Sequence, residues 1–252
     1  RHGLTDYPIH IKLDTGMHRA GFETADIAQV CALINGQTAV RVASTFSHLA
    51  AADEPTPPMD AFTMQQIACF AQNAAALEQG IGYTVIKHTL NTAGIERFAN
   101  YQFDMVRLGI GLWGMNCVNE QKLRNVCSLS TRIMQLKTVK AGDTVGYNRR
   151  GKIDHDTEIA LLPIGYADGM DRRLGNGIGA VFYNGQRAPI VGNICMDLMM
   201  VDVTGLNAAV GDEVVVFGDN HRISDIATTL GTIPYEVLTS IASRVRRVYF
   251  RE

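Results

Sequence analysis

The stretch Ile9-His-Ile-Lys-Leu-Asp-Thr-Gly-Met-His-Arg19 places an apolar run, interrupted by one lysine, directly before a polar turn that contains glycine. A short apolar run bounded by turn residues is typical of a buried strand. Working outward, the same pattern predicts further buried strands at Val40–Phe46, Thr84–Leu90 and Met105–Leu112.

Longer stretches with helical periodicity separate these runs. They predict helices at Ala25–Asn35 and Pro58–Gln79 and a short helical turn near Ala93–Phe98. Alternating strands and helices form βαβ units and hence a parallel sheet. Four such strands fit either a doubly wound sheet or part of an eight-stranded barrel, and the pattern alone does not choose between them.

The pattern changes after Asn116, where short β-rich runs with turn residues between them predict a second, mainly antiparallel domain. Its predicted strands are Ser128–Val139, Thr144–Tyr147, Glu158–Ile164, Gly179–Val191, Leu198–Val203, Glu213–Phe217 and Val245–Phe250. The pair Asn184-Gly185 predicts a two-residue hairpin turn. We place the domains at residues 1–118 and 119–252.

Two helices are expected near the C-terminal end of the second domain. Ser224 is the expected N-cap of a helix over Asp225–Leu230, with Gly231 just after its end. A second helix is expected over Tyr235–Ala242.

Composition excludes several classes of function. A formal charge of −2 gives no basic surface for nucleic acid and no polybasic patch for a membrane. Five cysteines without a C-x-x-C pair favour neither disulfides nor a zinc site. Asp154-His155-Asp156 is interpreted as a solvated loop, so no metal is expected. We expect a cytoplasmic protein that acts on a small molecule.

Five short motifs follow one another along the chain, and in this order they resemble alanine racemase: Lys12–Arg19, Arg107–Ile110, Val145–Tyr147, Pro163–Gly169 and Ile194–Asp197. The resemblance implies a fold of α/β plus all-β class. A partial (β/α)8 TIM-like barrel would be followed by a mainly antiparallel β domain. It also implies pyridoxal 5'-phosphate as cofactor and a two-base racemisation of L-alanine to D-alanine for peptidoglycan synthesis.

The resemblance gives three residues catalytic roles. Tyr147 is the expected base on the L-alanine face, and His48 contacts it. A free phenol has a pKa of about 10, so its phenolate needs stabilisation. Arg107 is expected against the pyridine nitrogen, to which a guanidinium does not give up its proton. Seen alone, Arg107 would be interpreted as part of a buried ion pair.

The remaining roles implied by the resemblance concern binding. Thr92, Gly109, Ile110 and Tyr235 are expected to bind the cofactor phosphate. Lys12 is expected to be carbamylated and to hold Arg107 and Arg19, although it could instead pair with Asp14. The expected substrate-binding residues are Arg19, Tyr166, Met196 and Asp197; the alternative for the tyrosine is ordinary aromatic packing.

The resemblance also implies a homodimer that binds alanine in active sites shared between subunits. The family's cofactor lysine would lie upstream of Arg1, so we expect this chain to be an inactive truncated piece of a full-length parent, which could be a fusion to a peptidoglycan-precursor ligase. Alternatives are a broad-specificity racemase, a related decarboxylase, or a non-catalytic cofactor-binding fragment.

Overall fold

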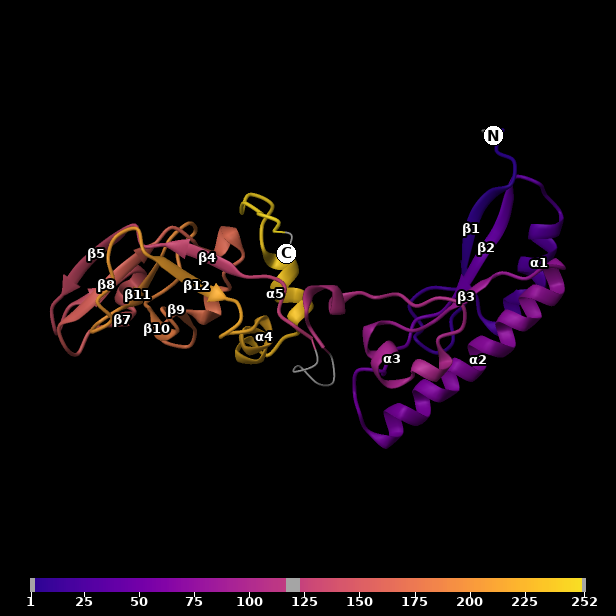
Figure 1. The fold of residues 1–252 in the computed structure, drawn as a ribbon, viewed down its shortest axis with the longest axis horizontal. Helices are drawn as coiled ribbons and strands as arrows, with labels where there is room; N and C mark the ends of the chain where they lie inside the picture. The colour runs from indigo at the N-terminus through magenta and orange to yellow at the C-terminus, as the bar shows by residue number, and fades with distance from the viewer. Residues whose placement is uncertain (1–2, 117–122, 251–252) are drawn as a thin grey trace. The chain divides into compact units, whose positions relative to one another are not determined.

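A computed structural model describes residues 3–116 and 123–250. The chain divides into two compact units, residues 1–124 and 125–252 (Figure 1). The expected boundary between residues 118 and 119 falls outside the described residues. Within the described residues, no helix is both long and apolar enough to cross a membrane. The same residues contain no group of three or more His, Cys, Asp or Glu side chains placed to hold a metal ion.

Three parallel strands form the sheet of the first unit, in the order β1-β2-β3. They are β1 (Tyr7–Lys12), β2 (Val40–Phe46) and β3 (Ile86–His88). The helices between them are α1 (Ile27–Asn35), which follows the 3-10 turn η1 (Thr24–Asp26), and α2 (Pro57–Ile81). Both helices lie along one face of the sheet (Figure 1). The predicted βαβ pattern is therefore confirmed.

The core of this unit lies between the sheet and the two helices. Its most deeply buried apolar side chains include Leu13, Val42, Phe70 and Leu77, each at most 1% exposed. Helix α2 begins with two prolines, which are pre-organised for the first turn, and Gly82, with φ +83°, caps its C-terminal end.

Helices α1 and α2 approach each other closely at Gly80. A Cβ atom on Gly80 would lie 2.4 Å from the Sγ atom of Cys31. We expect Gly80→Ala to lower the free energy of unfolding by about 1–3 kcal/mol, because overpacking outweighs the roughly 1 kcal/mol gain in helix propensity. Urea unfolding followed by circular dichroism measures the change. The double variant Gly80→Ala/Cys31→Ala should recover part of the loss, and an unchanged single variant would contradict the close packing.

The fourth predicted strand, Met105–Leu112, is wrong. The segment runs beside the end of β3 through two backbone hydrogen bonds, Asp104 N to Lys87 O (3.1 Å) and Arg107 N to Leu90 O (2.9 Å). It then turns into the 3-10 helix η3 (Ile110–Trp113). The Thr92 hydroxyl accepts the N–H groups of Gly109 and Gly111, so the backbone of this segment does not continue pairing with β3. The short helix α3 (Thr92–Arg97) lies where it was predicted.

Seven antiparallel strands form the main sheet of the second unit, in the order β4-β12-β9-β10-β11-β8-β5. Their bounds are β4 (Leu129–Arg132), β5 (Gln135–Val139), β8 (Thr157–Leu162), β9 (Ala180–Tyr183), β10 (Gln186–Val191), β11 (Met199–Asp202) and β12 (Glu213–Phe217). The short strands β6 (Thr144–Val145) and β7 (Gly151–Lys152) pair separately.

The sheet curls because its two outermost strands are consecutive in the chain. Only Ile133 and Met134 separate β4 from β5. Ile133 N donates to Asp212 O beside β12, and Met134 N donates to Leu161 O on β8. The segment that connects β4 to β5 therefore brings the two edges of the sheet together. The predicted single strand Ser128–Val139 is consequently two strands.

The hairpin prediction is confirmed. Asn184 (φ +47°) and Gly185 (φ +76°) connect β9 to β10, and both have the positive φ that a type I′ turn requires.

Two helices near the end of the chain differ from prediction only at their boundaries. Helix α4 spans Ile223–Leu230 and α5 spans Pro234–Ser240. The N-cap of α4 is Arg222, not Ser224, because the Asp225 carboxylate accepts the Arg222 N–H at 2.8 Å. Gly231 ends α4 with φ +67°, as predicted.

The predicted last strand, Val245–Phe250, is wrong. Arg247 donates hydrogen bonds to the carbonyl oxygens of Ile241, Ala242 and Val245. These bonds fold the chain back on itself, and among the described residues no strand pairs with residues 245–250.

Candidate functional site

Three cations, Lys12, Arg19 and Arg107, lie near enough to His48 to act on its charge, at the carboxyl ends of the parallel strands; we call them the cation cluster. Lys12 is the last residue of β1, and His48 follows β2 by two positions. Burial, and then the charges of Arg107, Arg19 and Lys12, lower the pKa of His48. The carboxyl ends of parallel strands are where α/β proteins bind ligands.

Within the described residues, none of the three cations forms an ion pair with a carboxylate. The ion pairs seen in the described part of the first unit include Arg41–Asp6, Lys87–Glu78, Lys87–Asp104 and Arg97–Asp60, and none of them involves these three cations. The alternative pairing of Lys12 with Asp14 is therefore wrong; the Asp14 carboxylate instead accepts the N–H groups of Gly16 (3.0 Å) and His18 (3.1 Å). Lys12 and Arg107 are partly buried, whereas Arg19 is exposed. Partly buried cations without acidic partners are suited to an anionic ligand.

Arg107 is held by acceptors that are all neutral. Nη1 donates to His88 Nδ1 (2.8 Å) and to His88 O (3.1 Å). Nη2 donates to the carbonyl oxygens of Ser47 (2.7 Å) and Thr89 (3.3 Å) and lies 3.5 Å from His48 Nδ1. Among the N–H groups of this guanidinium, only the Nε–H has no hydrogen-bond partner in the described part of the chain. The interpretation of Arg107 as part of a buried ion pair is wrong.

His88 is a site residue that the sequence reasoning missed. It ends β3, is 5% exposed, and stacks on the Phe46 ring with 5.3 Å between centroids. Burial, with the charges of Arg107 and His10, lowers the pKa of His88 to about 4. The imidazole is therefore neutral at pH 7 and can accept from Arg107. The available signal was its position: His88 lies two residues before the end of the predicted strand Thr84–Leu90, and His48 lies two residues after the end of Val40–Phe46.

The loop that carries His48 is fixed by buried polar side chains. Gln66, which is 1% exposed, donates to the His48 carbonyl oxygen (3.2 Å) and accepts the N–H of Ala50 (2.9 Å). The hydroxyls of Thr15 and Ser47 are 2.6 Å apart. Such a satisfied network holds the loop in one arrangement before any ligand binds.

Three of the four residues expected at the phosphate of a cofactor, Thr92, Gly109 and Ile110, come together at the start of α3; the fourth, Tyr235, lies on α5 of the second unit. Thr92 Oγ1 accepts the N–H groups of Gly109 (3.1 Å) and Gly111 (3.3 Å), and Ile110 lies between them. A Cβ on Gly111 would lie 2.8 Å from Leu108 Cδ1 and 3.0 Å from Thr92 Cγ2. Because the hydroxyl accepts two donors, its own proton remains available to an anion.

In the second unit, Tyr147 lies at the mouth of a cavity. It begins the 3-10 turn η5 (Tyr147–Arg149), between Gly146 (φ +76°) and Asn148 (φ +57°), and is 67% exposed. Asn193 Nδ2 donates to its carbonyl oxygen (3.2 Å). The cavity of about 450 Å³ is also lined by Lys137, Ile159, Leu161, Cys195 and Met200. The turn thus presents the phenol outward from a fixed backbone.

Tyr166 and Met196 come from two motifs that the fold joins. Tyr166 N donates to Cys195 O (3.0 Å), and Ala167 N donates to Met196 O (2.9 Å). Gly165 permits this approach, because a Cβ there would lie 2.3 Å from Cys195 O. The two motifs therefore form one rigid part of the surface.

Asp197 has a partner that the sequence reasoning missed. Arg244 donates to Asp168 (2.7 Å) and to Asp197 (2.5 Å), so one guanidinium links both motifs to the segment after α5. No sequence pattern marks Arg244, which lies about 50 residues from Asp197 in the printed sequence.

We expect Arg244→Ala to loosen this junction. The N–H of Ala242, bonded to Asp168 O, should exchange faster with deuterium, since the segment loses its charged anchor. Hydrogen exchange resolved by residue measures the effect. Arg246→Ala is the control, because Arg246 is exposed on the same segment; equal acceleration in both variants would rule out the anchoring role.

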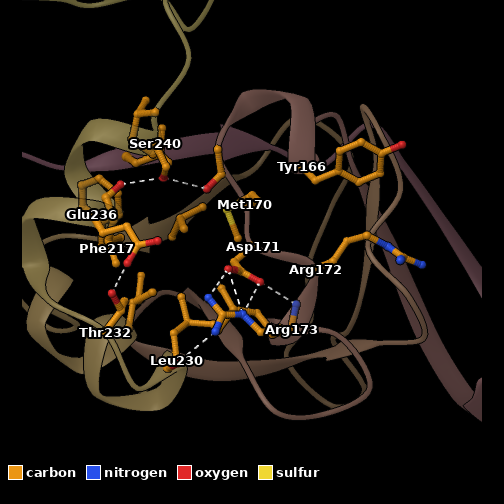
Figure 2. Close-up of a pocket in the computed structure, with 17 residues that line it drawn as sticks. Tyr166, Met170, Asp171, Arg172, Arg173, Phe217, Leu230, Thr232, Glu236 and Ser240 are labelled. Carbon is orange, nitrogen blue, oxygen red and sulfur yellow. Dashed lines mark hydrogen bonds and ion pairs between the residues drawn. The ribbon is translucent and has the colours of Figure 1, made fainter.

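A second cavity, of about 390 Å³, lies within the same unit, against helices α4 and α5 (Figure 2). Its lining is mostly apolar, with the pairs Glu236–Thr232 and Arg173–Asp171 at its edge. Tyr166 points away from these pairs in Figure 2. Tyr235 lies on α5 and is 46% exposed, but does not line this cavity.

Comparison with known proteins assigns both units. The first matches the alanine racemase N-terminal domain over residues 2–117, and the second matches the alanine racemase C-terminal domain over residues 126–249. A curated relative, alanine racemase of Helicobacter pylori strain J99, is 37% identical over 96% of this chain and 67% of its own length.

Solved structures agree with these matches. The alanine racemase of Streptomyces lavendulae, a D-cycloserine producer, has a TM-score of 0.90 at 32% identity and covers 98% of this chain. This chain corresponds to 67% of that structure. The alanine racemase of Bartonella henselae, whose structure contains covalently bound pyridoxal phosphate, has a TM-score of 0.85 at 31% identity, over 96% of this chain and 66% of its own.

The fold and the matched domains define a class, the pyridoxal-phosphate-dependent isomerases built from a barrel and a β domain. The chain belongs to the alanine racemase family. It spans about two thirds of the length of the relatives that it matches. The expected fold class, a partial TIM-like barrel followed by a β domain, is confirmed.

Proposed function

We propose that this chain supplies most of an alanine racemase, which interconverts L-alanine and D-alanine with pyridoxal 5'-phosphate. The observation that carries this proposal is the cation cluster of Lys12, Arg19 and Arg107, which has no acidic partner in the described residues. An anionic cofactor would supply the missing negative charge. The family match gives this cofactor its identity.

The residues present fit the cofactor in two places. The Nε–H of Arg107 has no hydrogen-bond partner in the described residues and would face a ring nitrogen, to which it donates a hydrogen bond without losing its proton. The hydroxyl of Thr92, with the backbone at Gly109 and Ile110, would hold the phosphate. When bound, pyridoxal phosphate supplies the electron sink that removal of an α-proton requires.

The other assignments follow from the chemistry of each side chain. Tyr147 would move the proton on the L-alanine face, and His48 would stabilise its phenolate by a hydrogen bond. Tyr166, Met196, Asp197 and Arg19 would bind substrate, and Tyr235 would contact the phosphate. Carbamylation of Lys12 would place a carboxylate beside Arg107 and Arg19, both of which lack one in the described residues.

We further propose that two copies of the full-length parent form a cytoplasmic homodimer, so that Tyr147 of one copy serves the cation cluster of the other. The product D-alanine would serve peptidoglycan synthesis. Residues 1–252 by themselves would not racemise alanine.

The test is chiral separation of alanine after incubation of the full-length parent with pyridoxal phosphate. Either enantiomer should convert to an equimolar mixture. If neither converts, the proposal fails. Serine and lysine as substrates distinguish a broad-specificity racemase, and release of carbon dioxide would identify a decarboxylase.

A further inference from the structure

We propose that Ser44 and His10 form a hydrogen-bonded relay behind His88 that fixes its tautomer and thereby positions Arg107. The relay crosses all three strands of the first unit, from His10 on β1 through Ser44 on β2 to His88 on β3. It deepens the proposed function, on which its catalytic consequence rests. Its structural consequence can be measured without substrate.

The direction of each hydrogen bond follows from what each group can donate. A guanidinium has no acceptor, so Arg107 Nη1 must donate to His88 Nδ1, at 2.8 Å. His88 Nδ1 is therefore unprotonated, and the neutral ring carries its proton on Nε2. That Nε2–H donates to Ser44 Oγ, 3.1 Å away.

The Ser44 hydroxyl connects His88 to His10 through a second hydrogen bond. Its oxygen accepts from His88, so its single proton points elsewhere, and His10 Nδ1 lies in short contact with it. In the neutral tautomer of His10 that carries its proton on Nε2, Nδ1 accepts this proton. The sequence of donors from Arg107 to His10 thus has one consistent direction.

Burial makes the part of this order from Ser44 to His88 rigid, whereas His10 is exposed. Ser44 is 1% exposed and His88 5% exposed, so water does not readily replace either partner. A buried polar group that loses its partner pays its full desolvation penalty, which disfavours a reversed arrangement between Ser44 and His88. Stacking on Phe46, with 2° between the rings, fixes the plane of His88.

The relay gives Arg107 its orientation. His88 Nδ1, together with the carbonyl oxygens of His88, Ser47 and Thr89, engages Nη1 and Nη2 and leaves the Nε–H free among the described residues. If His88 carried its proton on Nδ1, two donors would face each other and the guanidinium would turn. Ser44 and His10 are therefore positioning residues.

The experiment is ¹H–¹⁵N NMR of the chain at pH 8, where a histidine of ordinary pKa is neutral and His88, whose pKa is lower, is neutral too. Long-range ring correlations should show His88 protonated on Nε2 only. The Nη1 and Nη2 protons of Arg107 should give separate signals, because a held guanidinium rotates slowly. An Nδ1-protonated His88 in the unaltered chain would overturn the proposal.

Three variants separate the relay from general disturbance of β2. Ser44→Ala should merge the Arg107 Nη signals, and His10→Ala should do so partly. Thr45→Val is the matched control, since Thr45 is a neighbouring buried hydroxyl that bonds Ile11 O (3.1 Å) outside the relay. Separate Nη signals in Ser44→Ala, or equal merging in Thr45→Val, would refute the relay.

The effect of the relay on catalysis is tested in the full-length parent. Ser44→Ala should lower kcat by about 10- to 100-fold, as expected for a displaced contact, with little change in KM. If Ser44→Ala merges the Nη signals but leaves kcat unchanged, the proposed effect of the relay on catalysis is refuted, while the relay itself is supported. Absence of any racemase activity in the unaltered parent would instead refute the proposed function.

Discussion

Tyr147→Phe in the full-length parent should lower the rate of alanine racemisation by about 10²–10⁴-fold, the usual contribution of a general acid or base. The change removes the hydroxyl and keeps the ring, so the η5 turn, held through its backbone, should be preserved. The rate is measured in both directions by circular dichroism of alanine. With substrate deuterated at Cα, loss of label from L-alanine should fall most, because the phenol serves that face.

The matched control is Tyr249→Phe, which alters a phenol that is 84% exposed in the same unit. It should leave the rate unchanged. If Tyr147→Phe retains the rate of the unaltered protein, the assignment of Tyr147 as a base is excluded.

Lowering the pH from 6.5 to 4 should cost the first unit about 3 kcal/mol of unfolding free energy through His88 alone. The folded pKa of His88 is about 4, below the ordinary value of 6.5. As the pH falls through 6.5, His88 becomes protonated in the unfolded chain but stays neutral in the folded chain. The free energy of unfolding therefore decreases until the pH reaches 4, where the folded chain is protonated too. At about 1.4 kcal/mol per pKa unit, the difference gives the stated magnitude.

Trp113, the only tryptophan, lies in η3 of this unit, and its fluorescence reports urea unfolding there. His88→Gln should be less stable at pH 7 and should lose most of this pH dependence. His48, whose pKa is also lowered, contributes a remainder of the same sign. His155→Gln, an exposed histidine of the other unit, is the control; an equally flattened pH profile in that variant would contradict the assignment to His88.

Where local pattern and tertiary structure agree, the sequence predicted the elements closely. The strand Val40–Phe46 has the predicted bounds, and α2 differs by no more than two residues at either end. The signals for both elements are local: the strand is an apolar run, and the helix begins with proline and is followed by glycine. The Asn184-Gly185 turn was predictable for the same reason.

The predictions of strands at Met105–Leu112 and Val245–Phe250 were wrong because side chains bond to backbone groups in or beside these segments. Thr92 accepts N–H groups from the first run, and Arg247 donates to carbonyl oxygens around the start of the second. Neither side chain is adjacent to all the groups that it binds. A periodicity in apolar residues does not reveal such competition.

The order of motifs along the chain was enough to show the resemblance to the family, since motifs depend on residue type and spacing. The resemblance then implied the cofactor and the candidate residues. Only the tertiary structure showed that Arg107 has neutral acceptors, that His88 and Ser44 lie behind it, and that Arg244 joins two loops. Hydrogen bonds and charges act between groups that are near in space, and folding brings together side chains tens of residues apart in the chain.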